Sequence, residues 1–474
     1  MAAPVAITDA EIRLVPVATR LPFEYGIVTL TRMPHCFVRL TLTIDGAKTT
    51  GIAAEHLPPK WFTKLPDQPI DEEIEIMIEV VERACTAATE ATGETVFDCW
   101  EEIYQAQQQW GTDSPHPPLL WGFGVTFVER AMIDAFCRAT DTSFADAVRD
   151  GSFGIEPGRI YPELEGTSPG DVLDEPLDQI RVRHTVGYND PLDERPADAP
   201  EDGLPVTLEE NIEQYGVDRF KLKIGGDVDR DVSRLRDVLS VAEQQLDDYA
   251  FTLDANEQYD SVSDLRNLLE RLTADDAVDG FRERLLFVEQ PFDRSIALTP
   301  TVGDQLADWE DAPPIVIDES DGELQSFGRA LELGYAGTSY KSCKGVFKGI
   351  ANACLAAERR AAGAECVISG EDLSTIGPVC LPQDLAAMAT LGIEHVERNG
   401  HHYFRGLSMY DEDVQQTVLS AHPDLYRRHD DGFATLDVDE GVVPTMSVTK
   451  APFGFGGELD LSAYATPETW NFDV

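Results

Sequence analysis

The chain has 474 residues with 37 basic and 87 acidic side chains, a formal net charge of −50 at pH 7, and 42% of its residues are hydrophobic. The hydrophobic content excludes an acidic disordered chain, and the charge argues against nucleic acid or an anionic membrane as a partner. Such an acidic surface is typical of adaptation to high salt, which screens the repulsion between carboxylates. We therefore predict a folded, halophilic protein.

Lysine is scarce in this chain. It accounts for nine of the 37 basic residues, which are Lys48, Lys60, Lys64, Lys221, Lys223, Lys341, Lys344, Lys348 and Lys450. If lysine has been cleared from the exposed surface, those that remain are enriched in residues that the chemistry of the protein requires. The alternative is that a few have simply been retained.

The cysteines and the first residues of the chain predict where the protein resides. The eight cysteines lie at least eleven positions apart, so no CxxC pair exists for zinc or redox chemistry. We expect them to be reduced core residues. No basic region followed by an apolar stretch opens the sequence, and no apolar run reaches the length of a membrane span. The sequence therefore predicts a cytoplasmic protein.

Residues 1–150 are predicted to form an α+β domain. Residues 5–55 have the apolar alternation of β-strands, and Asp45–Gly46 is a strong hairpin-turn signal. From about Asp71 the apolar spacing changes to three and four residues, which predicts helices.

Two polar connections, 153–181 and 189–205, accompany a regular alternation of short apolar runs and helical segments. The eight runs are 183–188, 219–226, 251–256, 285–291, 314–320, 337–342, 366–372 and 394–400. This alternation predicts an α/β fold, a closed (β/α)₈ barrel over residues 151–430, with an open doubly wound sheet as the alternative. In a barrel the functional side chains lie at the carboxyl ends of the strands.

Carboxylates end three consecutive runs, at Asp254, Glu289 and Asp318. They would converge at the barrel mouth, where oxygen ligands in octahedral geometry suit Mg²⁺. Acidic residues are common in this chain, so any one of the three could be surface decoration. Their coincidence at three successive strand ends favours a metal site.

Three lysines flank this predicted metal site. Lys221 and Lys223 point to the same face of the second run, and Lys341 at the end of the sixth run approaches from the opposite side. A metal between opposed lysines suits removal of a proton next to a carboxylate: Mg²⁺ stabilises the enediolate, and one lysine takes the α-proton. We expect burial and neighbouring cations to lower the lysine pKa.

The ordered set FKLKIG, TLDAN, VEQP and IDES, followed by the lysine of the sixth run, resembles the enolase superfamily, within its muconate lactonising enzyme and mandelate racemase-like members that carry a KxK motif. The resemblance covers nearly the whole chain. It implies a (β/α)₈ barrel behind an N-terminal α+β capping domain, which the C-terminal segment 431–474 completes.

The resemblance also implies a role for each matching residue. The metal ligands would be Asp254, Glu289 and Asp318, and the two acid/base catalysts would be Lys223 and Lys341. Lys221 would be a supporting cation near the substrate carboxylate. Side chains next to the ligands would be Asn256, Gln290 and Glu319.

Two cap loops over the barrel mouth are implied as well, residues 22–34 and 55–68. Lys60 and Lys64 in the second loop either clamp a second anionic group of the substrate or are ordinary loop lysines. Lys344, beyond the sixth run, either contacts an anionic substrate group or begins a helix without contacting anything.

The last run is followed by His401 and His402 and differs from one branch of the family. The two histidines could face the site, but histidines in a polar loop are more often surface residues. The run also lacks the Asp-x-Asp that marks dipeptide epimerases in this subgroup, which argues against a dipeptide substrate.

The predicted function is Mg²⁺-dependent abstraction of the α-proton of a small-molecule carboxylate, which leads to racemisation, epimerisation, cycloisomerisation or β-elimination. We expect a homo-oligomer. Two alternatives stay open. One is a Schiff-base aldolase in which Lys341 or Lys223 attacks a carbonyl. The other is a non-catalytic member that keeps the metal site for structure or binding.

Overall fold

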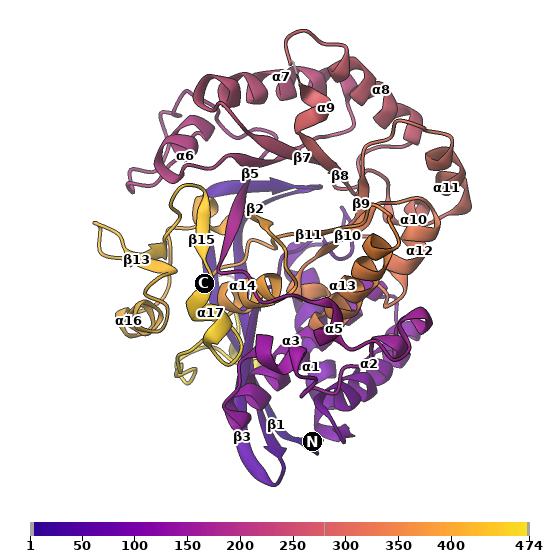
Figure 1. Cartoon of the computed structure of the whole chain (residues 1–474). Coiled ribbons are helices and arrows are strands. Elements are labelled where there is room, and N and C mark those ends of the chain that lie inside the picture. Colours follow the sequence, from indigo (N-terminus) through magenta and orange to yellow (C-terminus); the bar gives the residue numbers. More distant parts are fainter. Residues whose placement is uncertain (1–3, 279, 472–474) are drawn as a thin grey trace.

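Two β-sheets organise the chain, an antiparallel sheet near the N-terminus and a closed parallel barrel (Figure 1). The computed structural model describes residues 4–278 and 280–471. Within these residues, no helix has the length and apolar character needed to cross a membrane.

The N-terminal sheet is an antiparallel meander. Its strands are β1 (Val5–Tyr25), β2 (Val28–Ile44), β3 (Ala47–His56) and β4 (Thr92–Gly93), in the order β3-β2-β1-β4. Asp45 and Gly46 join β2 to β3 with φ of 48° and 80°. These left-handed conformations suit the tight hairpin turn that the Asp-Gly pair predicts, so the predicted hairpin is confirmed.

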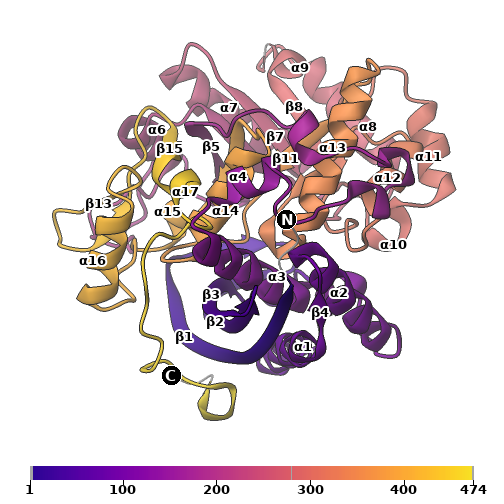
Figure 2. The ribbon, with the colours of Figure 1, turned by 60° about the horizontal axis from the view of Figure 1, so that its bottom comes forward.

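Four helices follow the meander: α1 (Ile70–Glu90), α2 (Val96–Thr112), α3 (Pro118–Thr140) and α4 (Phe144–Arg149). Helix α3 is buried along almost its whole length and lies against the sheet (Figure 2). A Cβ on Gly51 of β3 would stand 2.1 Å from the carbonyl oxygen of Ala131, so only glycine allows this close packing. On the other face of α3, toward the barrel, Glu129 accepts hydrogen bonds from the backbone amides of Val346 and Phe347.

Eight parallel strands form the barrel, and hydrogen bonds between its last and first strands close it. The strands are β5 (Gln179–Val186), β6 (Arg219–Lys223), β7 (Ala250–Asp254), β8 (Leu285–Glu289), β9 (Ile315–Ile317), β10 (Gly337–Tyr340), β11 (Val367–Gly370) and β12 (His395–Arg398). Each overlaps one of the eight predicted runs, and β5 begins four residues before its run, inside the predicted polar connection 153–181. The closed barrel is therefore confirmed over the open sheet.

Helices connect the barrel strands and surround them (Figure 1). They are α6 (Leu208–Tyr215), α7 (Val228–Gln245), α8 (Val262–Thr273), α9 (Phe281–Arg284), α10 (Arg294–Ala297), α11 (Pro300–Ala307), α12 (Ser326–Glu332), η3 (Ser342–Lys344), α13 (Val346–Ala361), α14 (Cys380–Thr390) and α15 (Gly400–Tyr403). The connection 153–181 carries the short elements η1 (Pro157–Arg159), η2 (Pro162–Leu164) and α5 (Pro169–Val172). The connection 189–205 has neither helix nor strand, and Arg20 of β1 binds it through Asp202.

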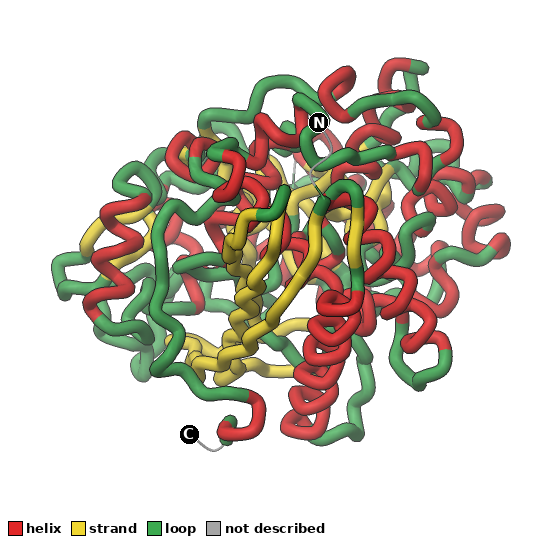
Figure 3. Tube along the Cα trace, turned by 90° about the horizontal axis from the view of Figure 1, so that it is seen from below, coloured by secondary structure: helices red, strands yellow, loops and turns green. Residues whose placement is uncertain are grey.

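The C-terminal part first extends the barrel and then returns to the N-terminal sheet. Its elements are α16 (Glu412–Ala421), β13 (Tyr426–Arg428), β14 (Ala434–Leu436), β15 (Val442–Pro444), α17 (Met446–Lys450) and η4 (Pro467–Thr469). Strand β15 pairs antiparallel with the beginning of β5. Further on, Leu14 of β1 exchanges backbone hydrogen bonds with Ala465. Seen from below, the long strands of the N-terminal sheet lie beside long helices (Figure 3).

All the cysteines and two unusual histidines lie in the core. All eight cysteines are buried and unpaired, which confirms the expectation of reduced core residues. His35 of β2 and His56 of β3 are cross-strand partners with ring centroids 4.5 Å apart. Both are fully buried, and no ring nitrogen of His35 has a hydrogen-bond partner among the described residues. Burial, helped by His56 and Arg130, holds the pKa of His35 well below its usual range.

The substitution His35→Leu is expected to stabilise the protein more at pH 5 than at pH 8. The folded state binds a proton at His35 more weakly than the unfolded state does, so wild-type stability falls as the pH drops below about 6.5. Leucine does not titrate. The advantage of the variant in unfolding free energy should grow by about 1 kcal/mol between pH 6 and pH 5. Urea denaturation at pH 8, 6 and 5 measures it, and an advantage that does not change with pH would contradict the prediction.

Candidate active site

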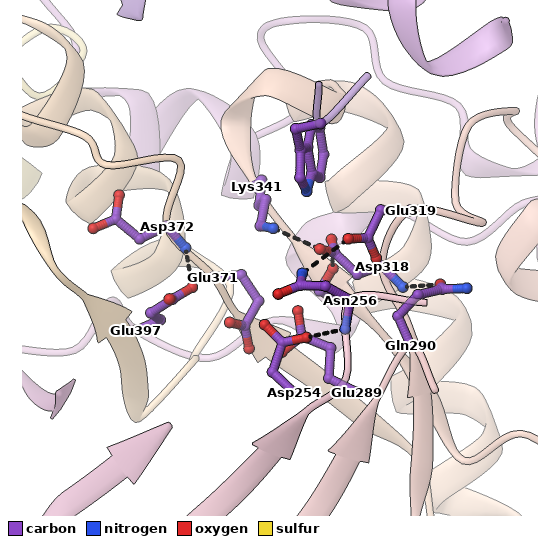
Figure 4. A network of polar contacts seen from close by, with 12 residues as sticks. Asp254, Asn256, Glu289, Gln290, Asp318, Glu319, Lys341, Glu371, Asp372 and Glu397 are labelled. Atoms are coloured by element: carbon purple, nitrogen blue, oxygen red, sulfur yellow. Dashed lines mark hydrogen bonds and ion pairs between the residues drawn. The ribbon is translucent and has the colours of Figure 1, made fainter. Parts of the chain in front are cut away.

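The carboxyl ends of the barrel strands bring the predicted residues to one place. Lys223 of β6 lies directly beside Asp254 of β7 in the strand register, and Asp254 lies beside Glu289 of β8. Asp318 follows β9 by one residue, and Lys341 follows β10 by one residue. The carboxylates of Asp254 and Glu289 point toward each other in Figure 4.

Lys221 lies at the centre of a buried group of four carboxylates. Its Nζ atom is 3.0 Å from Asp254, 2.8 Å from Glu289, 2.5 Å from Glu371 and 3.0 Å from Glu397. Burial alone would lower the pKa of Lys221, but the carboxylates, Asp254 first, outweigh it and raise the pKa well above its usual range. The expected position near a substrate carboxylate needs correction, because this ammonium is enclosed by the barrel's own acids.

A second group forms around Asp318. The Nζ of Lys341 donates to Oδ2 of Asp318 at 2.6 Å, and the Nζ of Lys344 lies 3.2 Å from Oδ1 (Figure 4 shows the first pair). Burial opposes ionisation of Asp318, but these two ammonium groups hold its pKa well below the usual range. Lys344 also donates to the hydroxyl of Ser339. Its ammonium therefore contacts Asp318 and Ser339, and not the anionic substrate group that the sequence offered as one possibility.

The Lys341 ammonium differs from the sequence expectation. Burial lowers its pKa, but the charge of Asp318 outweighs burial, and the net pKa is raised. The expected lowering was therefore wrong for Lys341 in this state, because the nearest group is a carboxylate and not a cation.

The three residues predicted beside the ligands connect the two groups. Asn256 accepts a hydrogen bond from Lys223 at 2.7 Å and donates to Glu319 at 3.0 Å. Gln290 accepts from the backbone amides of Asp318 and Ser320, so it shapes the turn that presents Asp318. Burial, together with the charge of Asp318, raises the pKa of Glu319 to about 7.

The cap contributes a hairpin and a loop. Residues 22–34, expected as a loop, are the paired ends of β1 and β2 around a turn at Gly26. Residues 57–69, which we call the cap loop, connect β3 to α1. Within the cap loop, Lys60 donates to the carbonyl oxygens of Leu65 and Gln68 and pairs with Glu73, so its ammonium has no room for a substrate.

The structure places Lys64, His401 and His402 differently from the sequence expectation. Lys64 pairs with Asp293 at 3.1 Å and donates to the carbonyl oxygen of Glu257, so it attaches the cap loop to the barrel. His401 and His402 are buried, not on the surface as favoured from the sequence. His401 shares a 3.2 Å contact between ring nitrogens with His184, and burial lowers its pKa to about 3.

Two acidic residues of the site were missed. Glu371 follows β11 directly and Glu397 lies in β12, and both are fully buried against Lys221. The signal was present, since each ends a predicted run as Asp254, Glu289 and Asp318 do. Trp61 of the cap loop, whose ring lies 4.5 Å from Nζ of Lys341, left no comparable signal, because this contact depends on the placement of the cap loop.

A cavity of about 450 Å³ opens beside Lys223. Lys223 and Asn256 line it from the barrel, Glu24 to Thr29 of the cap hairpin line it from the other side, and Arg230 of α7 completes the wall. The Arg230 guanidinium lies 4.2 Å above the ring of Tyr188. Polar side chains of both charges therefore surround this space.

Asp254, Glu289 and Asp318 fit a metal by chemistry. Oxygen donors at neighbouring strand ends suit Mg²⁺. Oε2 of Glu289 is buried and lies 2.8 Å from the Lys221 ammonium, which three other carboxylates share. Burial together with the charge of Asp254 outweighs this ammonium and raises the Glu289 pKa well above its usual range, so Lys221 alone does not offset the negative charge of the group. As the side chains stand, however, no three metal-binding side chains of the described part of the chain are grouped closely enough to hold an ion, because lysine ammonium groups lie between them.

A protein-family model covers most of the barrel strands. Residues 205–419 match the family model described as enolase C-terminal domain-like. No curated protein sequence matches the chain significantly.

Solved structures share the fold over nearly the whole chain. An isomerase from Streptomyces coelicolor A3(2) is 16% identical with a TM-score of 0.59, covering 97% of this chain and 99% of its own. A 2-chloromuconate cycloisomerase from Rhodococcus opacus 1CP is 17% identical with a TM-score of 0.58, covering 96% and 97%. A dipeptide epimerase from Enterococcus faecalis V583, complexed with Mg and a dipeptide, is 16% identical with a TM-score of 0.56, covering 84% and 92%.

Proposed function

We propose that the protein is an enzyme that removes the α-proton of a carboxylate substrate. The premise is that residues 205–419 are an enolase C-terminal domain-like segment in a chain with an enolase superfamily fold. The outcome would be racemisation, epimerisation, cycloisomerisation or β-elimination. The observation that carries the proposal is the placement of Lys223 and Lys341 on either side of Asp254, Glu289 and Asp318.

Asp254, Glu289 and Asp318 would hold a divalent cation, most simply Mg²⁺, which would stabilise the negative charge that develops on the substrate carboxylate. Lys223 and Lys341 are the residues placed to exchange the proton. Each is now paired with one of these acids, Lys223 with Asp254 and Lys341 with Asp318. If these carboxylates bound a cation, the two lysines would be free to contact the substrate.

Neighbouring residues of the chain orient the two lysines. Asn256 accepts from Lys223, and its backbone amide donates to Asp254, which holds the ammonium in the wall of the cavity. The indole of Trp61 lies over the Lys341 ammonium at 4.5 Å and separates it from solvent. The remainder of the substrate would extend from Lys223 into the cavity toward Arg230.

Exchange of the α-hydrogen for deuterium tests the proposal. The Mg²⁺-loaded protein is incubated in D₂O with a library of acid sugars, N-acyl amino acids and lactones, and exchange is followed by NMR. We expect exchange for at least one class, and its loss when EDTA removes the metal. Borohydride trapping of a substrate on a lysine, with no metal requirement, would instead identify a Schiff-base aldolase and contradict the proposal.

A further inference from the structure

The cap loop covers one of the two proposed proton-transfer lysines. Trp61 of this loop is only 6% exposed, and the face of its ring lies 4.5 Å from the Nζ of Lys341. On its other side the same ammonium donates to Asp318. Lys341 is therefore held between an indole face and a carboxylate, and the position of the cap loop determines whether solvent reaches it.

One arginine of the barrel binds the backbone of the cap loop at this point. Arg294 of α10 donates from Nη1 to the carbonyl oxygen of Phe62 at 2.7 Å and from Nη2 to that of Trp61 at 2.8 Å. One rigid guanidinium thus binds two successive backbone carbonyls, and this fixes the backbone at Trp61.

Glu257, in the loop after β7, fixes the arginine in turn. Its carboxylate accepts from Nε of Arg294 at 2.9 Å and from Nη2 at 2.8 Å, and from the Arg294 backbone amide at 2.6 Å. Glu257 is 6% exposed, and its φ of 68° is unusual for a residue other than glycine. Such strained conformations concentrate at functional positions, where the surrounding structure maintains them.

We propose that Glu257 and Arg294 form a latch that holds the cap loop closed and positions Trp61 over Lys341. Arg294 is a positioning residue in this arrangement, because it acts on Lys341 only through the Trp61 peptide. The role of Lys341 in proton transfer rests on the proposed function, but the latch itself is defined by contacts that exist without substrate. Lys64 and Asp293 form a second attachment of the same loop.

Chemical labelling of lysine measures the latch directly. The full-length protein is treated with formaldehyde and a borane reductant for short times, and dimethylation of each lysine is quantified by peptide mass spectrometry. With only nine lysines in the chain, each can be followed separately. In the wild type, Lys341 should react far more slowly than the exposed Lys48 and Lys450.

Arg294→Gln is expected to raise the labelling rate of Lys341 about tenfold without changing that of Lys48 or Lys450. Arg294→Lys keeps the charge but cannot reach both carbonyls, so its effect should be intermediate. Trp61→Leu should raise Lys341 labelling as well. The matched control is Arg329→Gln, because Arg329 also donates twice to a backbone carbonyl, that of Leu298, outside the cap loop. It should leave Lys341 at the wild-type rate.

Two results would overturn the latch. One is wild-type labelling of Lys341 in both Arg294→Gln and Trp61→Leu. The other is an equal rise at all lysines, which would show that Arg294 supports the fold as a whole. Because no substrate enters this experiment, a protein that shows the latch but no deuterium exchange would contradict only the proposed function.

Discussion

Replacing Lys221 with methionine is expected to lower the free energy of unfolding by about 3–5 kcal/mol at pH 8, the cost of leaving buried charges without their partner. The ammonium contacts four carboxylates, those of Asp254, Glu289, Glu371 and Glu397, and its side chain is 1% exposed. Methionine fills a similar volume, so the loss reports charge and not packing.

The pH dependence of Lys221→Met distinguishes this cause from any other. Without the ammonium, the pKa values of the enclosed carboxylates rise above those in the unfolded chain, so the folded variant binds protons more strongly. The deficit relative to wild type should therefore shrink as the pH falls from 8 to 5. Denaturant unfolding in the same salt measures it. Lys48→Met, at an exposed position of β3, is the control and should change stability by less than about 0.5 kcal/mol. A Lys221→Met variant as stable as wild type would refute the assignment.

Removal of either proton-transfer lysine is expected to slow deuterium exchange by about 10² to 10⁴-fold, the usual contribution of one general acid or base. If the enzyme racemises or epimerises its substrate, the two lysines serve opposite faces. Lys223→Ala should then abolish exchange from one stereoisomer and Lys341→Ala from the other.

The same pair of variants identifies the reaction type. If the enzyme catalyses elimination or cyclisation, one variant should lose exchange and the other should keep part of it, because only one lysine removes the proton. Lys450→Ala, an exposed lysine of α17, serves as the control and should retain the wild-type rate. Each reaction is followed by NMR from separately supplied stereoisomers. Wild-type exchange in both Lys223→Ala and Lys341→Ala would remove these residues from the mechanism.

Local patterns predicted the barrel well. Each strand is a short buried apolar run. Such runs, and the helices that flank them, can be recognised from residues that are close together in the sequence. The carboxylates and lysines at the strand ends followed from the same register, because the barrel brings all carboxyl ends together. Helix α2 lies in the region predicted as helical from about Asp71 on, and Thr95 and Asp98 form a capping box at its start.

The partner of each charge could not be predicted from the sequence. Lys60 and Lys344 look like free cations in the sequence, but the fold turns one toward Glu73 and the other toward Asp318. A lysine pKa depends on which group lies nearest, and for Lys341 that group is a carboxylate. His401 was favoured as a surface residue because the element that covers it is distant in sequence. The domain limits 1–150, 151–430 and 431–474 stay predictions.

The C-terminal strand β15 has a consequence for the synthesis of the chain. Strand β5 begins the barrel, yet it gains one neighbour only when β12 has formed and another only when β15 has formed. Strand β1 of the N-terminal sheet likewise waits for Ala465. These pairings cannot form before residues 442–465 have left the ribosome, so β1 and β5 each lack one partner while the intervening residues are made, and such long-range pairings slow folding.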